Sequence, residues 1–91
     1  MEKRTLFHRI QLQKEDGDPI ELRYYLLTDE RIDRQSAAYG VEVELLHQQK
    51  LQSCAYRDIT SVETRILEIL RLLARNAVTP VTVSDVLEDL L

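Results

Sequence analysis

The sequence is poor in glycine, proline and cysteine, and it has no tryptophan. Its two glycines, Gly17 and Gly40, lie far apart, which excludes the glycine-rich loop that brings a backbone close to a phosphate group. The one cysteine, Cys54, has no second cysteine with which to form a disulfide in the chain. No apolar run is long enough for a signal peptide or a membrane span, so we expect a cytoplasmic protein of a reducing compartment.

Positive charge is also scarce. The formal net charge is −4, and no lysine or arginine follows Arg75. General binders of nucleic acids or anionic membranes need a basic patch that neutralises phosphates, so this balance speaks against both classes. A role as a nucleic-acid-binding regulator remains an alternative only if five arginines lie together in a basic stripe on the surface. These are Arg4, Arg9, Arg23, Arg31 and Arg34.

The composition that remains is that of a folded domain. Hydrophobic residues make up 44% of the chain and charged residues 31%, which is far from the signature of disorder. A chain of 91 residues allows one domain, so we expect residues 1–91 to fold as a single unit of modest stability.

Two segments with alternating apolar and polar residues predict a first hairpin, with strands over about residues 5–13 and 20–28. Between them, Glu15-Asp16-Gly17 suits a three-residue loop whose last residue is left-handed, and this loop pairs Lys14 with Asp18. The register then follows. It places Leu12 opposite Ile20, Ile10 opposite Leu22, His8 opposite Tyr24, Phe7 opposite Tyr25 and Leu6 opposite Leu26.

The same alternation predicts a second hairpin, with strands over about residues 39–47 and 51–59. We expect a tight turn at Gln49 and Lys50, and the pairs across the hairpin follow from it. They are Leu45 with Cys54, Val43 with Tyr56, Glu42 with Arg57 and His47 with Gln52.

Helical periodicity predicts helices over about residues 61–76 and 83–90. Thr60 with Glu63 matches a capping box, Asn76 suits a left-handed stop, and Thr82 with Asp85 suits a second cap. A sheet with one apolar face needs a cover. The pattern therefore predicts an α+β fold, a four-stranded antiparallel meander covered on one face by two C-terminal helices (ββββαα).

Four segments of the chain resemble a family of short uncharacterised proteins from anaerobic Gram-positive bacteria. They are Arg23-Tyr24-Tyr25-Leu26-Leu27, Tyr39-Gly40-Val41-Glu42-Val43-Glu44, Arg57-Asp58-Ile59 and the connector from Leu72 to Thr82. The resemblance covers nearly the whole chain and is most specific from Ala74 to Thr82. It implies a cytoplasmic bacterial protein of a family with no assigned activity, so it transfers no catalytic residue.

Few side chains are candidates for chemistry. Zinc needs three or four converging ligands, and the sequence offers His8, His47, Cys54 and surface acids, so we assign no metal site. Cys54 would be a nucleophile if His47 lay within hydrogen-bonding reach, but the expected register separates them, which favours a buried, inert thiol. His8, opposite Tyr24 on the apolar face, is better explained as a core or edge histidine than as a base, and its ring could hydrogen-bond the Tyr24 hydroxyl. A small ligand-binding domain or enzyme that uses these three residues remains an alternative.

One patch is harder to explain by folding alone. On the side of the sheet opposite the core, where alternation should place charges, the sequence has Phe7, Tyr25 and Leu27. Clustered aromatic and aliphatic side chains are typical of protein interfaces. We therefore predict a noncatalytic module with no cofactor and no identifiable small-molecule ligand, which binds a protein partner or a second copy of itself through these residues.

Overall fold

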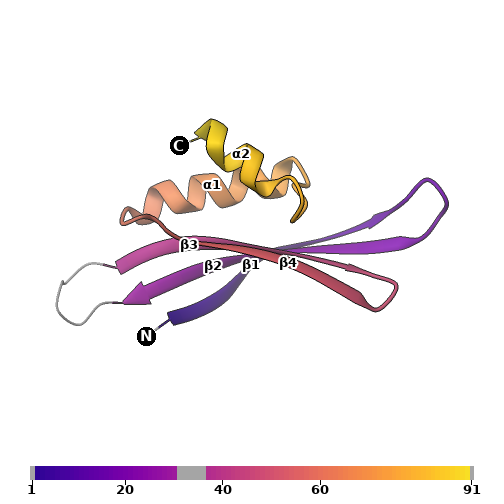
Figure 1. Cartoon of the computed structure of the whole chain (residues 1–91), viewed down its shortest axis with the longest axis horizontal. Helices are drawn as coiled ribbons and strands as arrows, with labels where there is room; N and C mark the ends of the chain where they lie inside the picture. Colours follow the sequence, from indigo (N-terminus) through magenta and orange to yellow (C-terminus); the bar gives the residue numbers. More distant parts are fainter. Residues whose placement is uncertain (1, 31–36, 91) are drawn as a thin grey trace.

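The computed structural model describes residues 2–30 and 37–90, and its elements follow the order ββββαα (Figure 1). The strands are β1 (Glu2–Gln13), β2 (Pro19–Glu30), β3 (Ala37–His47) and β4 (Lys50–Thr60), and the helices are α1 (Glu63–Arg75) and α2 (Val83–Leu90). The strands form one antiparallel sheet in the order β1-β2-β3-β4. The predicted α+β meander with two C-terminal helices is confirmed.

The first hairpin turns as its loop sequence predicts. The amide of Lys14 donates to the carbonyl of Asp18 at 2.9 Å, and Gly17 takes the left-handed conformation with a φ of 88°. The register beside the loop is also confirmed. It pairs Leu12 with Ile20, Ile10 with Leu22 and His8 with Tyr24.

A bulge at Phe7 changes the pairing in the first half of β1. Tyr25 lies opposite Leu6, so the predicted pairs of Phe7 with Tyr25 and of Leu6 with Leu26 are wrong. The bulge inserts one extra residue, which reverses the side to which every earlier residue points. Phe7 consequently packs against the core, while Arg4 lies on the opposite side of the sheet.

The second hairpin turns one residue earlier than predicted. Gln48 and Gln49 both have positive φ angles, of 50° and 64°, which is the backbone of a two-residue hairpin turn of the I′ type. The register therefore slips by two residues from the prediction, and the four predicted pairs are wrong. The observed pairs are His47 with Lys50, Leu45 with Gln52, Val43 with Cys54, Glu42 with Ala55 and Val41 with Tyr56. A slip of two leaves each side chain on its predicted face.

Gly40 accommodates a second irregularity, in β4. The register shifts between Tyr39, which pairs with Thr60, and Val41, which pairs with Tyr56, so Gly40 faces a bulged segment of β4. A Cβ atom on Gly40 would lie 2.2 Å from the carbonyl oxygen of Tyr56. Only glycine allows the backbone of β4 to approach this closely.

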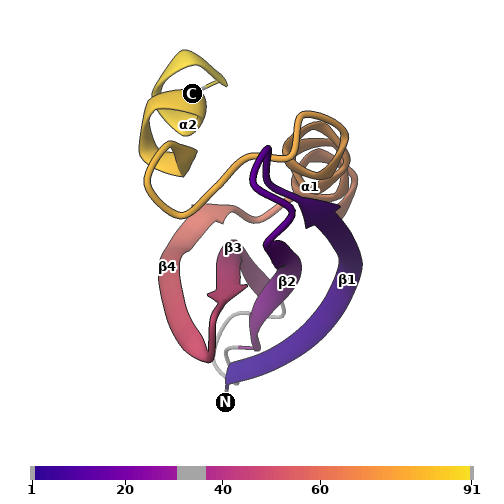
Figure 2. The same cartoon turned by 90° about the vertical axis from the view of Figure 1, so that its right-hand side faces the viewer.

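The two helices lie over one half of the strongly twisted sheet, α1 toward β1 and α2 toward β4 (Figure 2). The core lies between the sheet and the helices, where the Tyr24 hydroxyl donates to the carbonyl of Val78 at 2.8 Å. Its most buried members include Leu22, Tyr24, Val41, Val43, Ile66, Ile69, Leu70, Leu73 and Val83. No helix in the described part of the chain is long and apolar enough to span a bilayer.

The helix ends differ in detail from the predictions. Helix α1 begins at Glu63 with Val62 as its N-cap and no side-chain cap, because the Thr60 hydroxyl accepts a hydrogen bond from the Val62 amide instead. The left-handed residue at its C-terminus is Ala77, with a φ of 48°, and not Asn76. The Asn76 side chain donates to the carbonyl of Leu72, and this satisfies one of the last carbonyls of the helix.

Candidate functional site

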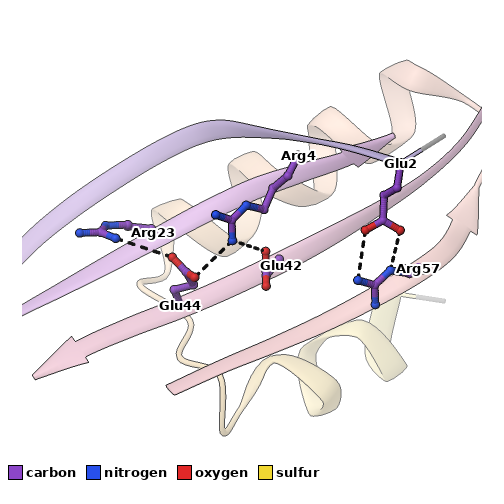
Figure 3. A network of polar contacts seen from close by, with 6 residues as sticks. All are labelled: Glu2, Arg4, Arg23, Glu42, Glu44 and Arg57. Atoms are coloured by element: carbon purple, nitrogen blue, oxygen red, sulfur yellow. Dashed lines mark hydrogen bonds and ion pairs between the residues drawn. The ribbon is translucent and has the colours of Figure 1, made fainter. Parts of the chain in front are cut away.

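The outer face of the sheet, the side turned away from the helices, carries a connected group of charged residues (Figure 3). The Nη1 atom of Arg4 lies 3.0 Å from Glu42 Oε1 and 3.3 Å from Glu44 Oε2. Arg23 lies 3.8 Å from the other carboxylate oxygen of Glu44. The bulge at Phe7 makes this group possible, because it turns Arg4 of β1 onto the face of the β3 carboxylates.

Glu44 is buried, with a relative exposure of 6%, and the two arginines offset the cost of burying its charge. Beside it, the Arg4 guanidinium stacks on the Tyr25 ring, 4.2 Å from the centroid. Partial burial raises the pKa of the Tyr25 hydroxyl, and the neighbouring Glu44 raises it further. The centre of the outer face is therefore filled by contacts within the chain.

A second ion pair joins the two edge strands. Arg57 of β4 donates from Nε to Glu2 Oε2 at 2.7 Å and from Nη2 to Glu2 Oε1 at 3.1 Å, which is a bidentate contact (Figure 3). Hydrogen bonding to Arg57 lowers the pKa of the Glu2 carboxyl. This pair crosses the inner strands at the end where β1 begins, beside a hollow of about 30 Å³ lined by Leu27 and Gly40 among others.

The structure separates the three predicted interface residues. Phe7 is half-buried on the helix side of the sheet, where it packs against the core. Tyr25 is half-buried under Arg4 on the outer face, and Leu27 is only 3% exposed. The three side chains therefore do not form one patch, because the bulge places Phe7 on the other side of the sheet from Tyr25.

The residues considered for nucleophilic chemistry are also apart. Cys54 is half-buried against the core and pairs with Val43, whereas His47 lies four residues farther along β3, at the hairpin turn. At about 3.3 Å per residue this is roughly 13 Å, too far for a hydrogen bond. His8 is exposed, and the hydroxyl of its partner Tyr24 donates to Val78 instead. The expected hydrogen bond between His8 and Tyr24 is therefore wrong.

The neighbours of Cys54 and His47 are also defined. Cys54 raises the pKa of the Tyr56 hydroxyl, and Ser84 of α2 partly offsets this effect. His47 Nε2 is buried at 3.6 Å from Asp18 Oδ2, a distance that is too long for a hydrogen bond. Gln48 donates to the same oxygen of Asp18 at 2.9 Å, so Asp18 connects the ends of the two hairpins.

The arginines proposed for a basic stripe lie among carboxylates where the structure describes them. Arg4 contacts Glu42 and Glu44, and Arg23 contacts Glu21 and Glu44. Arg9 lies 4.0 Å from Glu21. Arg31 and Arg34 lie outside the described residues. The three described arginines are thus partly neutralised, and they do not form an uninterrupted basic stripe.

The part of the sheet beyond the helices is more open. Both hairpin turns project past α1 and α2 (Figure 1). A hollow of about 700 Å³ lies there between the hairpins, with Pro19, Ile20, Leu46 and Gln48 in its lining. Aliphatic side chains are exposed or half-buried at this end. We call Leu12 and Ile20, on the helix side of the sheet, and Leu46 and Leu51, on its outer side, the hairpin-end surface.

The sequence contained a signal for this surface that alternation alone did not reveal. Leu46 follows Leu45 and so breaks the alternation of β3, which places one leucine on each side of the sheet. Leu51 lies opposite Leu46 and is 56% exposed, while Leu12 is 38% exposed.

Across residues 2–30 and 37–90, no group of three or more His, Cys, Asp or Glu side chains is placed to hold a metal ion.

One comparison with known proteins identifies a relationship. A model of a protein family, described as Family of unknown function (DUF6514), matches residues 3–91. The predicted resemblance to a family of uncharacterised proteins is therefore confirmed. No curated protein and no solved structure is significantly similar to the chain.

Proposed function

We propose that this chain, which belongs to the DUF6514 family of unknown function, is a noncatalytic module that works by binding a protein, including a second copy of itself. The observation that supports this most directly is the hairpin-end surface. Its four aliphatic side chains lie outside the core that the described residues of the sheet form with α1 and α2.

The position of these leucines argues for binding rather than for folding. Leu51 is 56% exposed and Leu12 is 38% exposed, so neither gains much from burial in the isolated chain. They lie on opposite sides of the same thin extension of the sheet. Single exposed leucines are normal, but Leu12, Ile20 and Leu46 together line the hollow of about 700 Å³, and apolar side chains gathered at a hollow are typical of an interaction surface.

The chemistry around the surface also fits a protein partner. The hollow is lined by amide side chains as well as aliphatic ones, including Gln11, Gln13, Gln48 and Gln49. An apolar centre with a polar, hydrogen-bonding rim is the usual anatomy of a protein interface. Cys54 and His47 are too far apart to act together, which leaves the noncatalytic reading as the better supported one.

We infer a cytoplasmic, bacterial setting for this activity. The resemblance of the Ala74–Thr82 connector to proteins of anaerobic Gram-positive bacteria supports the source. The single cysteine and the absence of a disulfide within the chain suit a reducing compartment.

Substitution at the hairpin ends tests the proposed function. The double variant Leu12→Asp with Leu51→Asp should stay folded, since both side chains are exposed, and should lose association with itself and with any partner retained on an affinity column. Val81→Asp is a matched control, because Val81 is 75% exposed but lies between the helices. If the double variant associates with proteins as strongly as the control does, the hairpin-end surface is not the binding site.

A further inference from the structure

We infer that the partner is a second copy of this chain, and that the two copies pair antiparallel along the open edge of β4 with Ser53 opposite Ser53 on the two-fold axis. This inference rests on the proposed function and specifies its partner. The product would be one continuous eight-stranded sheet. Backbone hydrogen bonds between the edges would supply the contact.

The two edges of the sheet differ in how they are protected. A natural edge strand usually carries charges, bulges or proline, which prevent pairing with another chain. β1 has such features, with a bulge at Phe7 and the basic residues Lys3, Arg4 and Arg9. β4 has none of them from Leu51 to Tyr56, a run without charge, proline or register shift. In β1 the corresponding run is shorter, from Ile10 to Gln13, so the longer unprotected edge segment is that of β4.

The free backbone groups of β4 follow from its hairpin. A two-residue turn makes His47 and Lys50 a hydrogen-bonded pair, and such pairs alternate along an antiparallel ladder. Leu51, Ser53 and Ala55 consequently direct their N–H and C=O groups away from β3, toward the open edge. Leu51 and Ser53 are exposed, and Ala55 is half-buried.

The register follows from where β4 is straight. The straight segment begins after the turn at Gln48 and Gln49, and it ends at the bulge that follows Tyr56. Ser53 lies at its midpoint. A two-fold axis there uses the whole segment. Leu51 would face Ala55 of the second copy, and Ser53 would face its own equivalent.

Side-chain chemistry favours this pairing of identical strands. On the outer face, a small Ser53 and a small Ala55 leave room for Leu51 of the other copy, which would cover an exposed leucine of the hairpin-end surface. On the helix side, Gln52 would face Cys54. No two like charges lie opposite each other, so self-pairing carries no electrostatic penalty.

Cysteine crosslinking tests the register. In an antiparallel hydrogen-bonded pair the two Cα atoms lie about 5.5 Å apart, within the range that a disulfide spans. Ser53→Cys in a Cys54→Ser background should form a covalent dimer under mild oxidation. Gln52→Cys in the same background is the matched control, because its two copies would lie about 8 Å apart on the diagonal and should crosslink far more slowly.

A charge tests the interface without a crosslink. Ser53→Lys would place two ammonium groups opposite each other and should weaken the dimer on the order of tenfold. Gln11→Lys, at an exposed position of β1, makes the same charge change and should leave the dimer unchanged. Circular dichroism would verify that both variants are folded.

The outcomes separate this inference from the proposed function. A native chain that stays monomeric at every concentration, or crosslinking of the Gln52 control as fast as the Ser53 variant, would overturn pairing at β4. If the monomer still binds another protein, and Leu12→Asp with Leu51→Asp abolishes that binding, the proposed function stands without this partner. A dimer that Ser53→Lys does not weaken would equally refute the β4 interface.

Discussion

Alanine at position 40 should be among the most damaging small substitutions in the chain. The new Cβ would lie 2.2 Å from the carbonyl oxygen of Tyr56 and 2.9 Å from the Cα atom of Arg57. Both are backbone atoms, so no side-chain rotation relieves the clash. Ordinary contact lies near 3.5 Å, so β4 would have to move by about 1 Å or more.

The cost follows from the size of that movement. Overpacking in a well-packed site costs about 1–3 kcal/mol, and a clash with backbone belongs at the upper end, so we expect Gly40→Ala to cost about 3 kcal/mol. At about 0.05–0.15 kcal/mol per residue, a chain of 91 residues is stable by about 5–14 kcal/mol. With a slope near 1 kcal/mol per molar urea, the unfolding midpoint should fall by about 3 M.

Gly17→Ala provides the matched control. Gly17 has a φ of 88° but nothing within 4 Å of its Cβ position, so alanine there meets backbone strain without a clash. That strain costs about 1 kcal/mol. Urea unfolding followed by circular dichroism compares the two variants. A loss at Gly40 smaller than the loss at Gly17 would refute the close approach of β4 to β3.

Three further outcomes are expected. Burial raises the pKa of Tyr24 to about 12. The contribution of Tyr24 to stability is therefore complete below pH 10 and should be lost as the pH rises toward 12. Ultraviolet titration should show a late-ionising tyrosine, and Tyr24→Phe should remove it. Hydrogen bonding to Arg57 lowers the pKa of Glu2, so the pair stabilises the fold above pH 4.5 and less as the pH falls below it. The difference in urea midpoint between wild type and Glu2→Gln should therefore shrink as the pH is lowered from 4.5. Arg65 donates to the carbonyl of Leu90 at 3.0 Å, and α2 has no basic residue of its own in its last turn. Arg65→Ala should therefore lower the free energy of unfolding in urea by about 1 kcal/mol. An unchanged urea midpoint would show that Arg65 does not stabilise the end of α2.

The sequence predicted the architecture because its strong signals are local. The Glu15-Asp16-Gly17 loop determined the first hairpin, and the register beside it is correct from Leu12 to His8. Helical periodicity identified the buried face of α1, where Ile66, Ile69, Leu70 and Leu73 contact the sheet. These patterns depend on residues that are neighbours in the chain.

The candidate site was harder to predict because it depends on irregularities. The bulge at Phe7 has no sequence signature comparable to the glycine loop. It nevertheless places Phe7 on the core side of the sheet and Arg4 on the outer side, the reverse of what alternation predicts. The turn at Gln48 and Gln49 lacks the Asn-Gly chemistry that marks a I′ turn, so the second register slipped. The Leu45-Leu46 break in alternation marks a leucine on the outer face, but whether the helices cover a leucine depends on their tertiary placement.

Binding through the projecting half of the sheet is tested most directly by the absolute mass of the native chain. Light scattering behind a sizing column, at concentrations from about 10 µM to 1 mM, spans the range of weak association. We expect the mass to rise from 10.7 kDa toward that of two chains, and the rise to disappear in the Leu12→Asp, Leu51→Asp variant. A mass of 10.7 kDa at every concentration, together with no protein retained by the immobilised chain, would contradict a binding role for this surface.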